Sequence, residues 1–160
     1  MEPIEMLQKR HVRLMQNSVK TLGHILHFVS PETAVSRRDG PNGWTILEVV
    51  CHLRDFDGFF YDRVMMMLEQ DHPMLPAYDH EQIAIDRRYN EQDLRQAYAD
   101  LVASRQRFVA LFKSLDAAQW ARTGIHPERD SFGVTDAAVQ LGHHDNDHLE
   151  QITRILVEGV

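Results

Sequence analysis

The chain has very little cysteine and no long apolar run. Its one cysteine, Cys51, excludes the internal disulfide framework that small secreted proteins use. No apolar stretch approaches the length of a membrane span, since residues 65–68 form only a short run flanked by charge. The first residues also lack the basic start and apolar run of a signal peptide. These absences predict a cytoplasmic protein with no membrane partner.

Positive charge is scarce relative to negative charge. The sequence carries 17 lysines and arginines against 24 aspartates and glutamates, and its formal net charge is -7. Broad binding to nucleic acid needs a basic face, so we predict no nucleic-acid partner. The chain also has no Walker A loop, no G-x-G-x-x-G loop, no G-x-S-x-G elbow and no strand-like alternation of useful length.

What the sequence does contain is helical periodicity. With 160 residues and 43% hydrophobic content, it is long enough for one domain with a substantial core. Apolar residues recur at helical spacing in four segments, which are residues 3–29, 46–70, 90–115 and 134–158. We therefore predict an all-α fold, a single-domain four-helix bundle spanning residues 1–160.

The connections between these segments differ in character. Residues 30–43 form a loop rich in proline and glycine. Long connections join the second helix to the third, at residues 71–89, and the third to the fourth, at residues 116–133. Loops of this length are often functional, and we expect residues 78–89 and 124–133 to form the mouth of a site. Ile83 to Ile85 are expected to make a short helical turn.

Local signals indicate where the helices begin. Thr45 with Glu48 three residues later is typical of a capping box at the start of the second helix. Asn90 with Asp93 indicates the start of the third helix. Asp136 suits the first turn of the fourth helix, where negative charge is favourable.

Histidine is the residue type that carries chemistry in this sequence. His144 and His148 are four apart in the last helix, so they stand on one face and can bind one metal ion together. His52, in the second helix, is the best candidate for a third ligand. His143 is left out, because adjacent helix positions do not share a face. Paired histidines on a helix are also often surface or core residues without a ligand, so spacing alone leaves both interpretations open.

Two neighbours of His52 have competing interpretations. Asp55 lies three residues on and is expected to accept the second N–H of the imidazole and orient it, unless it is simply exposed to solvent. Glu48 could also accept this N–H, but its place in the capping box already explains a glutamate at this position. Cys51 is expected to be a buried, inert thiol rather than a nucleophile.

Three stretches resemble the DinB-like superfamily, the DNA-damage-inducible, metal-binding four-helix bundles. They are W-T-I-L-E-V-V-C-H-L-R-D at residues 44–55, H-D-N-D-H-L-E-Q-I at residues 144–152, and residues 120–128 in the third connection. The resemblance implies a divalent metal held by His52, His144 and His148. Zinc or nickel is expected first, with iron or manganese as alternatives, and a homodimer is implied by the same likeness.

The resemblance also implies a function. Three neutral nitrogens leave a coordination position open for water or substrate, which is typical of a catalytic site. We expect a metal-dependent enzyme that acts on a small molecule, either a hydrolase or a transferase that activates a low-molecular-weight thiol such as bacillithiol, mycothiol or glutathione. His126 is the main acid/base candidate, followed by Tyr61 and Glu150. The alternatives are a non-catalytic metal-binding stress-response protein or binding module, and a helical dimerisation domain in which the three histidines do not converge.

Overall fold

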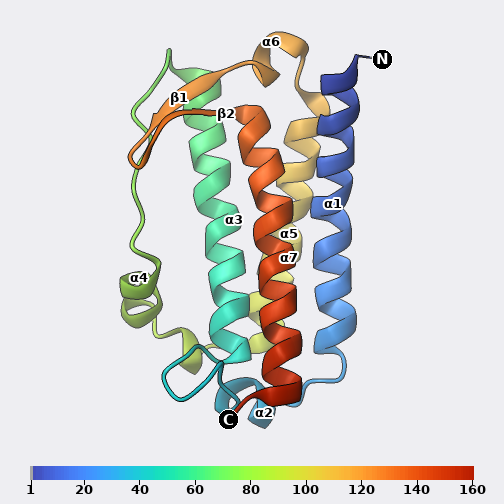
Figure 1. Cartoon of the computed structure of the whole chain (residues 1–160), viewed down its shortest axis with the longest axis vertical. Helices are drawn as coiled ribbons and strands as arrows, with labels where there is room; N and C mark the ends of the chain where they lie inside the picture. The colour runs from blue at the N-terminus through green and yellow to red at the C-terminus, as the bar shows by residue number, and fades with distance from the viewer. Residues whose placement is uncertain (1) are drawn as a thin grey trace.

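Four long helices make up most of the protein in the computed structural model, which describes residues 2–160 apart from the side chain at position 130 (Figure 1). The prediction of an all-α four-helix bundle is confirmed. The long helices are α1 (Pro3–Leu26), α3 (Ile46–Glu69), α5 (Leu94–Ser114) and α7 (Val134–Glu158). The shorter elements are α2 (Pro31–Ser36), α4 (His80–Asp86), the 3-10 helix η1 (Tyr89–Glu91), α6 (Ala117–Trp120), β1 (Thr123–His126) and β2 (Arg129–Gly133).

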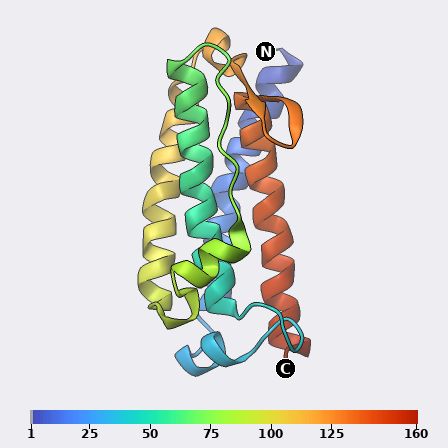
Figure 2. The same cartoon turned by 90° about the vertical axis from the view of Figure 1, so that its left-hand side faces the viewer.

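The helices pack in a ring in which α1 contacts α7 and α5, while α3 contacts the same two helices from the other side. Figure 1 shows α1 and α7 running in one direction and α3 and α5 in the other. Since α3 and α5 are parallel, the chain must return the length of the bundle between them. Figure 2 shows this return, with α4 in it, along the outside of the bundle. No helix within residues 2–160 is both long and apolar enough to cross a membrane.

The capping box predicted at the start of α3 is confirmed. The backbone N–H of Glu48 donates to Thr45 Oγ1 at 3.2 Å, and the backbone N–H of Thr45 donates to the Glu48 carboxylate at 2.7 Å. The predicted start of the third helix is wrong by three residues. Asp93 is the N-cap of α5 and accepts from the N–H of Gln96 at 2.7 Å. Asn90 instead accepts from the Thr45 hydroxyl at 2.6 Å, which ties η1 to the start of α3.

Three further features differ from the expectations, and one agrees with them. The first helix ends at Leu26 rather than at position 29, and the loop after it contains α2. The helical turn expected at positions 83–85 is confirmed as part of α4. The strands β1 and β2, which were not predicted, form an antiparallel hairpin. Strands of four and five residues with a break in register are too short to give a clear two-residue pattern in the sequence.

The core consists of two apolar clusters separated by a polar layer. One cluster includes Met15, Phe60, Phe108 and Leu141, and the other includes Leu22, Leu47, Leu101 and Ile152. Each long helix contributes one buried polar residue to this layer. These residues are Ser18, Asp57, Arg105 and Asp145.

The polar layer is an ion cluster centred on Arg105. Its Nε donates to Asp57 at 2.6 Å, and its Nη1 and Nη2 donate to the two oxygens of Asp145 at 2.5 and 3.1 Å. Ser18 also donates to Asp145, at 2.5 Å, and Arg105 reaches the carbonyl oxygen of Met15 at 2.7 Å. All four long helices are therefore joined by side chains that are almost completely buried.

Replacing Arg105 tests how much this cluster contributes to stability. Arg105→Met leaves two buried carboxylates without a counter-charge, so we expect the free energy of unfolding to fall by about 3–5 kcal/mol. Chemical denaturation followed by circular dichroism measures the change. Arg95→Met, an exposed substitution on the same helix, is the control and should shift the free energy by less than about 0.5 kcal/mol. An equally small loss for Arg105→Met would contradict this account of the core.

Candidate metal centre

Three histidine side chains from two helices meet between α3 and α7. His52 comes from α3, and His144 and His148 come from successive turns of α7. The Nε2 atoms of His52 and His144 are 2.9 Å apart, and those of His144 and His148 are 3.1 Å apart. Their ligand atoms all lie within 4.8 Å of one another. The convergence expected from the sequence is confirmed, and the interpretation as a helical domain without such a cluster is excluded.

The spacing of these nitrogens fits a divalent metal ion. An ion with three nitrogen ligands at about 2.0–2.1 Å needs nitrogen–nitrogen separations of about 2.9–3.4 Å, depending on the coordination geometry. The observed separations of 2.9 and 3.1 Å fall in this range. In the part of the chain that the structure describes, no other group of three or more His, Cys, Asp or Glu residues converges in this way.

A chain of hydrogen bonds outside the cluster orients His148. Its Nδ1 lies 2.7 Å from the side-chain oxygen of Gln151, which can only accept, so Nδ1 carries the proton. The lone pair of Nε2 therefore faces the other two histidines, as a metal ligand requires. The amide of Gln151 in turn donates to Asp39 at 3.0 Å, and Asp39 forms an ion pair with Arg154.

These outer partners were not predicted. Gln151 follows His148 by three residues on α7, and that spacing was the one sign of its role in the sequence. Asp39 lies in the loop between α2 and α3 and is far from α7 along the chain. Nothing in the sequence connects the two positions.

Aromatic rings surround the three imidazoles. Phe56 stacks on His144 with a centroid distance of 3.6 Å and an interplanar angle of 8°. Trp44 lies 4.9 Å from His52, and His80, at the start of α4, packs edge-on against His52 at 5.0 Å. His144 Nδ1 is buried and has no hydrogen-bond partner among the described residues, so stacking on Phe56 rather than a hydrogen bond to Nδ1 orients the ring from outside the cluster.

Burial keeps the imidazoles neutral. Desolvation, followed by the neighbouring His148 and His80, lowers the pKa of His52 from 6.5 to about 2. Desolvation likewise lowers the pKa of His144 well below its ordinary value, and that of His148 to a lesser extent. Neutral imidazole is the form that binds a metal ion, so the environment selects the form that a ligand needs.

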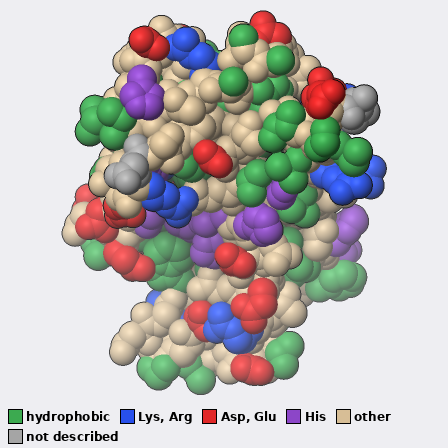
Figure 3. Space-filling model, turned by 45° about the horizontal axis from the view of Figure 1, so that its top comes forward, with side chains coloured by type: hydrophobic (Ala, Val, Ile, Leu, Met, Phe, Trp, Pro, Cys, Tyr) green, Lys and Arg blue, Asp and Glu red, His purple; other side chains and the backbone are tan. Residues whose placement is uncertain are grey.

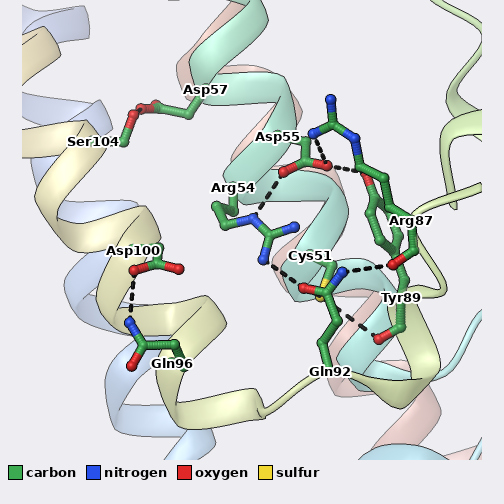
Figure 4. A network of polar contacts seen from close by, with 10 residues as sticks. All are labelled: Cys51, Arg54, Asp55, Asp57, Arg87, Tyr89, Gln92, Gln96, Asp100 and Ser104. Atoms are coloured by element: carbon green, nitrogen blue, oxygen red, sulfur yellow. Dashed lines mark hydrogen bonds and ion pairs between the residues drawn. The ribbon is translucent and has the colours of Figure 1, made fainter.

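Asp55 does not take the position expected from the sequence. Its carboxylate accepts from Arg54 Nε at 2.8 Å, from Arg87 Nη1 at 2.7 Å and from the Tyr89 hydroxyl at 2.5 Å (Figure 4). None of its hydrogen bonds among the described residues goes to His52. Asp55 therefore anchors the α3–α5 connection to α3, and the hydrogen bond that would orient His52 is not formed.

His126, the predicted acid/base residue, lies on β1 and contacts a different set of groups. Its Nε2 is 3.3 Å from Arg63 Nη1, and its Nδ1 accepts from the backbone N–H of Glu128 at 3.1 Å. Its ring packs against Phe132 at 5.5 Å. A catalytic role for His126 stays a prediction.

The remaining candidates lie in other surroundings. His143 faces His11 on α1, with ring centroids 5.6 Å apart, and is not one of the three converging histidines. Tyr61 packs against Phe108, and Glu150 pairs with Arg154. The expectation that Cys51 is buried is confirmed, and desolvation raises its pKa to about 12, which disfavours the reactive thiolate.

The fold and the site together define a four-helix bundle with a three-histidine cluster suited to a divalent metal ion. The sequence profile of the DinB superfamily matches residues 5–152. The chain belongs to the DinB superfamily.

Known proteins resemble the chain over most of its length. A protein of Halalkalibacterium halodurans, named as a proposed metal-dependent hydrolase, is 23% identical over 94% of this chain and 90% of its own length. A protein of Oceanobacillus iheyensis with the same kind of name is 27% identical over 89% of this chain and 78% of its own. The solved structure of YfiT from Bacillus subtilis matches with a TM-score of 0.85 and 23% identity, covering 92% of this chain and 85% of that one. YfiT is described as a probable metal-dependent hydrolase with an unusual four-helix bundle topology.

The metal content of two adjacent variants tests the ligand assignment. We expect His144→Ala to lose bound metal, because the central nitrogen of the cluster is removed. His143→Ala is the matched control and should keep the wild-type metal content, since its ring faces His11. Protein purified without an affinity tag and analysed by mass spectrometry for metals gives the measurement. Equal metal contents in the two variants would refute the assignment.

The metal-free protein should lose stability in acid because of its buried histidines. The unfolded chain binds protons on these residues below pH 6.5, whereas the folded chain does not protonate His52 until near pH 2. The unfolded state therefore holds more protons in this window, and the free energy of unfolding falls as the pH falls. The slope should be at most about 1.4 kcal/mol per pH unit for each such histidine.

Denaturation of the metal-free protein between pH 7.5 and pH 5 measures this slope. His52→Gln should make it shallower, because one of the residues whose folded pKa is lowered is gone. His143→Gln is the matched control and should leave the slope close to that of the wild type, because the exposed His143 is not one of the three converging histidines. A slope that does not depend on His52 would contradict the proposed origin of the acid sensitivity.

Proposed function

We propose that this protein is a metal-dependent hydrolase in which His52, His144 and His148 hold a divalent ion. The observation that carries the proposal is the meeting of three neutral imidazole nitrogens at metal-binding distances. The names of the similar proteins from Halalkalibacterium halodurans and Oceanobacillus iheyensis support hydrolysis as the reaction. When bound, the ion would supply a Lewis acid that lowers the pKa of a water molecule in an open coordination position.

Access to the cluster supports a catalytic rather than a purely structural site. His52 is buried, but His144 and His148 are half-buried, so one side of the cluster is open to solvent. Figure 3 shows histidine side chains at the surface among apolar and acidic ones. Three protein ligands leave at least one position for an exchangeable ligand, whereas structural sites usually have four protein ligands.

His80 is the residue of this chain best placed to move a proton at the site. Its ring packs against His52 at 5.0 Å, and it is half-buried at the start of α4. Burial, followed by the charge of Arg63, lowers its pKa, so it is neutral at pH 7 and able to accept a proton. We propose His80 as the general base, with His126 as the competing candidate.

The second candidate function is that of a thiol transferase. The same open position would take a low-molecular-weight thiol, whose pKa the ion would lower in the same way. Its support is the family resemblance alone. A non-catalytic metal-binding protein would need the ion to lack an exchangeable ligand, which the half-buried histidines argue against.

Activity of two histidine variants tests the proposal. Zinc- and nickel-loaded protein is assayed with ester, amide and lactone substrates, with and without glutathione or bacillithiol. We expect His80→Ala to lower kcat about 100-fold or more while its metal content stays at the wild-type level, because removal of a general base costs about that much. His126→Ala is the comparison, and a larger loss there would transfer the acid/base role to His126. No turnover of any substrate by metal-loaded wild-type protein would favour the non-catalytic alternative.

A further inference from the structure

Arg63 on α3 is buried, and its guanidinium has no ion-pair partner among the side chains that the structure describes. The residue is 5% exposed, and its Nε and Nη2 groups both donate to the carbonyl oxygen of Pro76, at 3.2 and 2.5 Å. Among the described residues, no carboxylate lies within ion-pair distance of its guanidinium. By contrast, Arg105 has two carboxylate partners and Arg54 has one. A buried charge normally needs such a partner, because desolvation of an ion is costly.

His126 does not accept a hydrogen bond from Arg63 either. A neutral imidazole has one N–H and one acceptor nitrogen. Since Nδ1 of His126 accepts from the backbone N–H of Glu128, its Nε2 carries the proton and cannot accept from Arg63 Nη1, 3.3 Å away. Arg63 has five N–H groups, and Pro76 takes two of them. The others have no acceptor among the described residues.

Arg63 lies on the same side of α3 as the metal centre. His52, Phe56 and Arg63 are separated by four and seven residues, so they follow one face of the helix. The Arg63 guanidinium lies 5.3 Å from the Phe60 ring, Phe60 stacks on Phe56 at 4.3 Å, and Phe56 stacks on His144 at 3.6 Å. The face between Arg63 and the three histidines is therefore lined by aromatic rings.

A second path of rings leads from Arg63 to the cluster along the α3–α5 connection. Tyr78 lies 5.0 Å from the guanidinium and 6.5 Å from His80, which packs against His52 at 5.0 Å. The positive charge of Arg63 contributes to lowering the pKa of both His80 and His126. Glu128, the carboxylate whose charge favours protonated Arg63, is exposed on the hairpin turn and lies beyond ion-pair distance.

The positive charge on this face would be balanced by one negatively charged group of a ligand. The three histidines are neutral, so a divalent ion would keep its full charge, and Arg63 adds another positive charge on the same face of α3. The unpaired N–H groups of a guanidinium match the oxygens of a carboxylate or phosphate.

We propose that Arg63 recognises an oxyanion of the substrate, a carboxylate or a phosphate, while the reacting group of that substrate lies at the three histidines. The substrate is then an anionic small molecule that lies between the two positions, beside the half-buried rings of Tyr78 and His80. This inference rests on the proposed hydrolase function for the reaction and on Arg63 for the substrate class.

A matched pair of esters tests the substrate class in zinc-loaded protein. The 4-nitrophenyl monoester of sebacic acid carries a free carboxylate on a chain long enough to reach from the histidines to Arg63, and 4-nitrophenyl methyl sebacate is its neutral counterpart. The wild-type protein should have a higher kcat/KM for the anionic ester. Arg63→Met should reduce the ratio of the two kcat/KM values about 10- to 100-fold, the range expected for losing hydrogen bonds to a charged group. Arg63→Lys keeps the positive charge but loses the paired N–H groups of the guanidinium, so it should give an intermediate ratio.

Two controls distinguish a loss of substrate recognition from a loss of folded structure. Arg107→Met removes an exposed arginine that stacks on Tyr61 and should leave the ratio unchanged. Thermal unfolding of each variant reports whether losing the contact with Pro76 loosens the α3–α5 connection. If Arg63→Met does not fold, the ratio for Arg63→Lys decides. A ratio that Arg63→Met or Arg63→Lys leaves at the wild-type value would overturn the proposal, as would a wild-type preference for the neutral ester.

Anion binding to the metal-free protein tests Arg63 without relying on activity. Inorganic phosphate and glutarate are titrated separately, and the arginine Nε–Hε signals are followed by NMR. The Arg63 signal should shift, while those of Arg54 and Arg105, which already have carboxylate partners, should not. Anion binding at Arg63 without any ester turnover would sustain this inference and reject the hydrolase. Turnover without a shift of the Arg63 signal by either anion would do the reverse.

Discussion

A guanidinium held between two carboxylates fixes the four long helices against one another. Arg105 of α5 reaches Asp57 of α3 and Asp145 of α7, and Ser18 of α1 joins the same cluster. Because these groups are almost fully buried, each helix has one rotation about its axis that satisfies them. With Asp145 turned inward, the preceding residue on α7 is rotated by about 100°, which places His144 toward α3.

The metal centre follows from this rotation and from a second set of polar contacts. His148 lies one turn beyond His144 and is oriented by Gln151, which Asp39 holds in turn. Stacking of Phe56 on His144 completes the arrangement from the α3 side. The α3–α5 connection passes beside the cluster, where His80 packs against His52 and Tyr78 lies between His80 and Arg63. The connection is therefore part of the candidate site as well as a link between parallel helices.

The sequence was sufficient for those parts of the molecule that depend on local spacing. Helical periodicity predicted the four long helices, and the spacing of His144 and His148 predicted a shared face. Contacts between distant segments left no such pattern. Asp55 was expected to orient His52 because it is near in sequence, but Arg87 and Tyr89 of the distant connection take its oxygens. The β1–β2 hairpin was missed because its strands are too short to show alternation.

Charged residues at core-facing positions of a helix were a further signal in the sequence, because they indicate buried polar contacts. Arg105 falls among the core-facing positions of the third helix, where a charge needs a buried partner, and the sequence offers no way to identify Asp57 and Asp145 as those partners. Arg63 lies in line with His52 and Phe56 on the second helix, but its position in the sequence does not indicate that no described carboxylate forms an ion pair with it.

Crystallography of zinc-loaded protein, with anomalous differences measured at the zinc edge, tests the central claim most directly. The account predicts one peak between the Nε2 atoms of His52, His144 and His148, at about 2.0–2.1 Å from each, with a non-protein ligand completing the coordination. A zinc ion bound elsewhere, or one closed off by a fourth protein ligand, would contradict it.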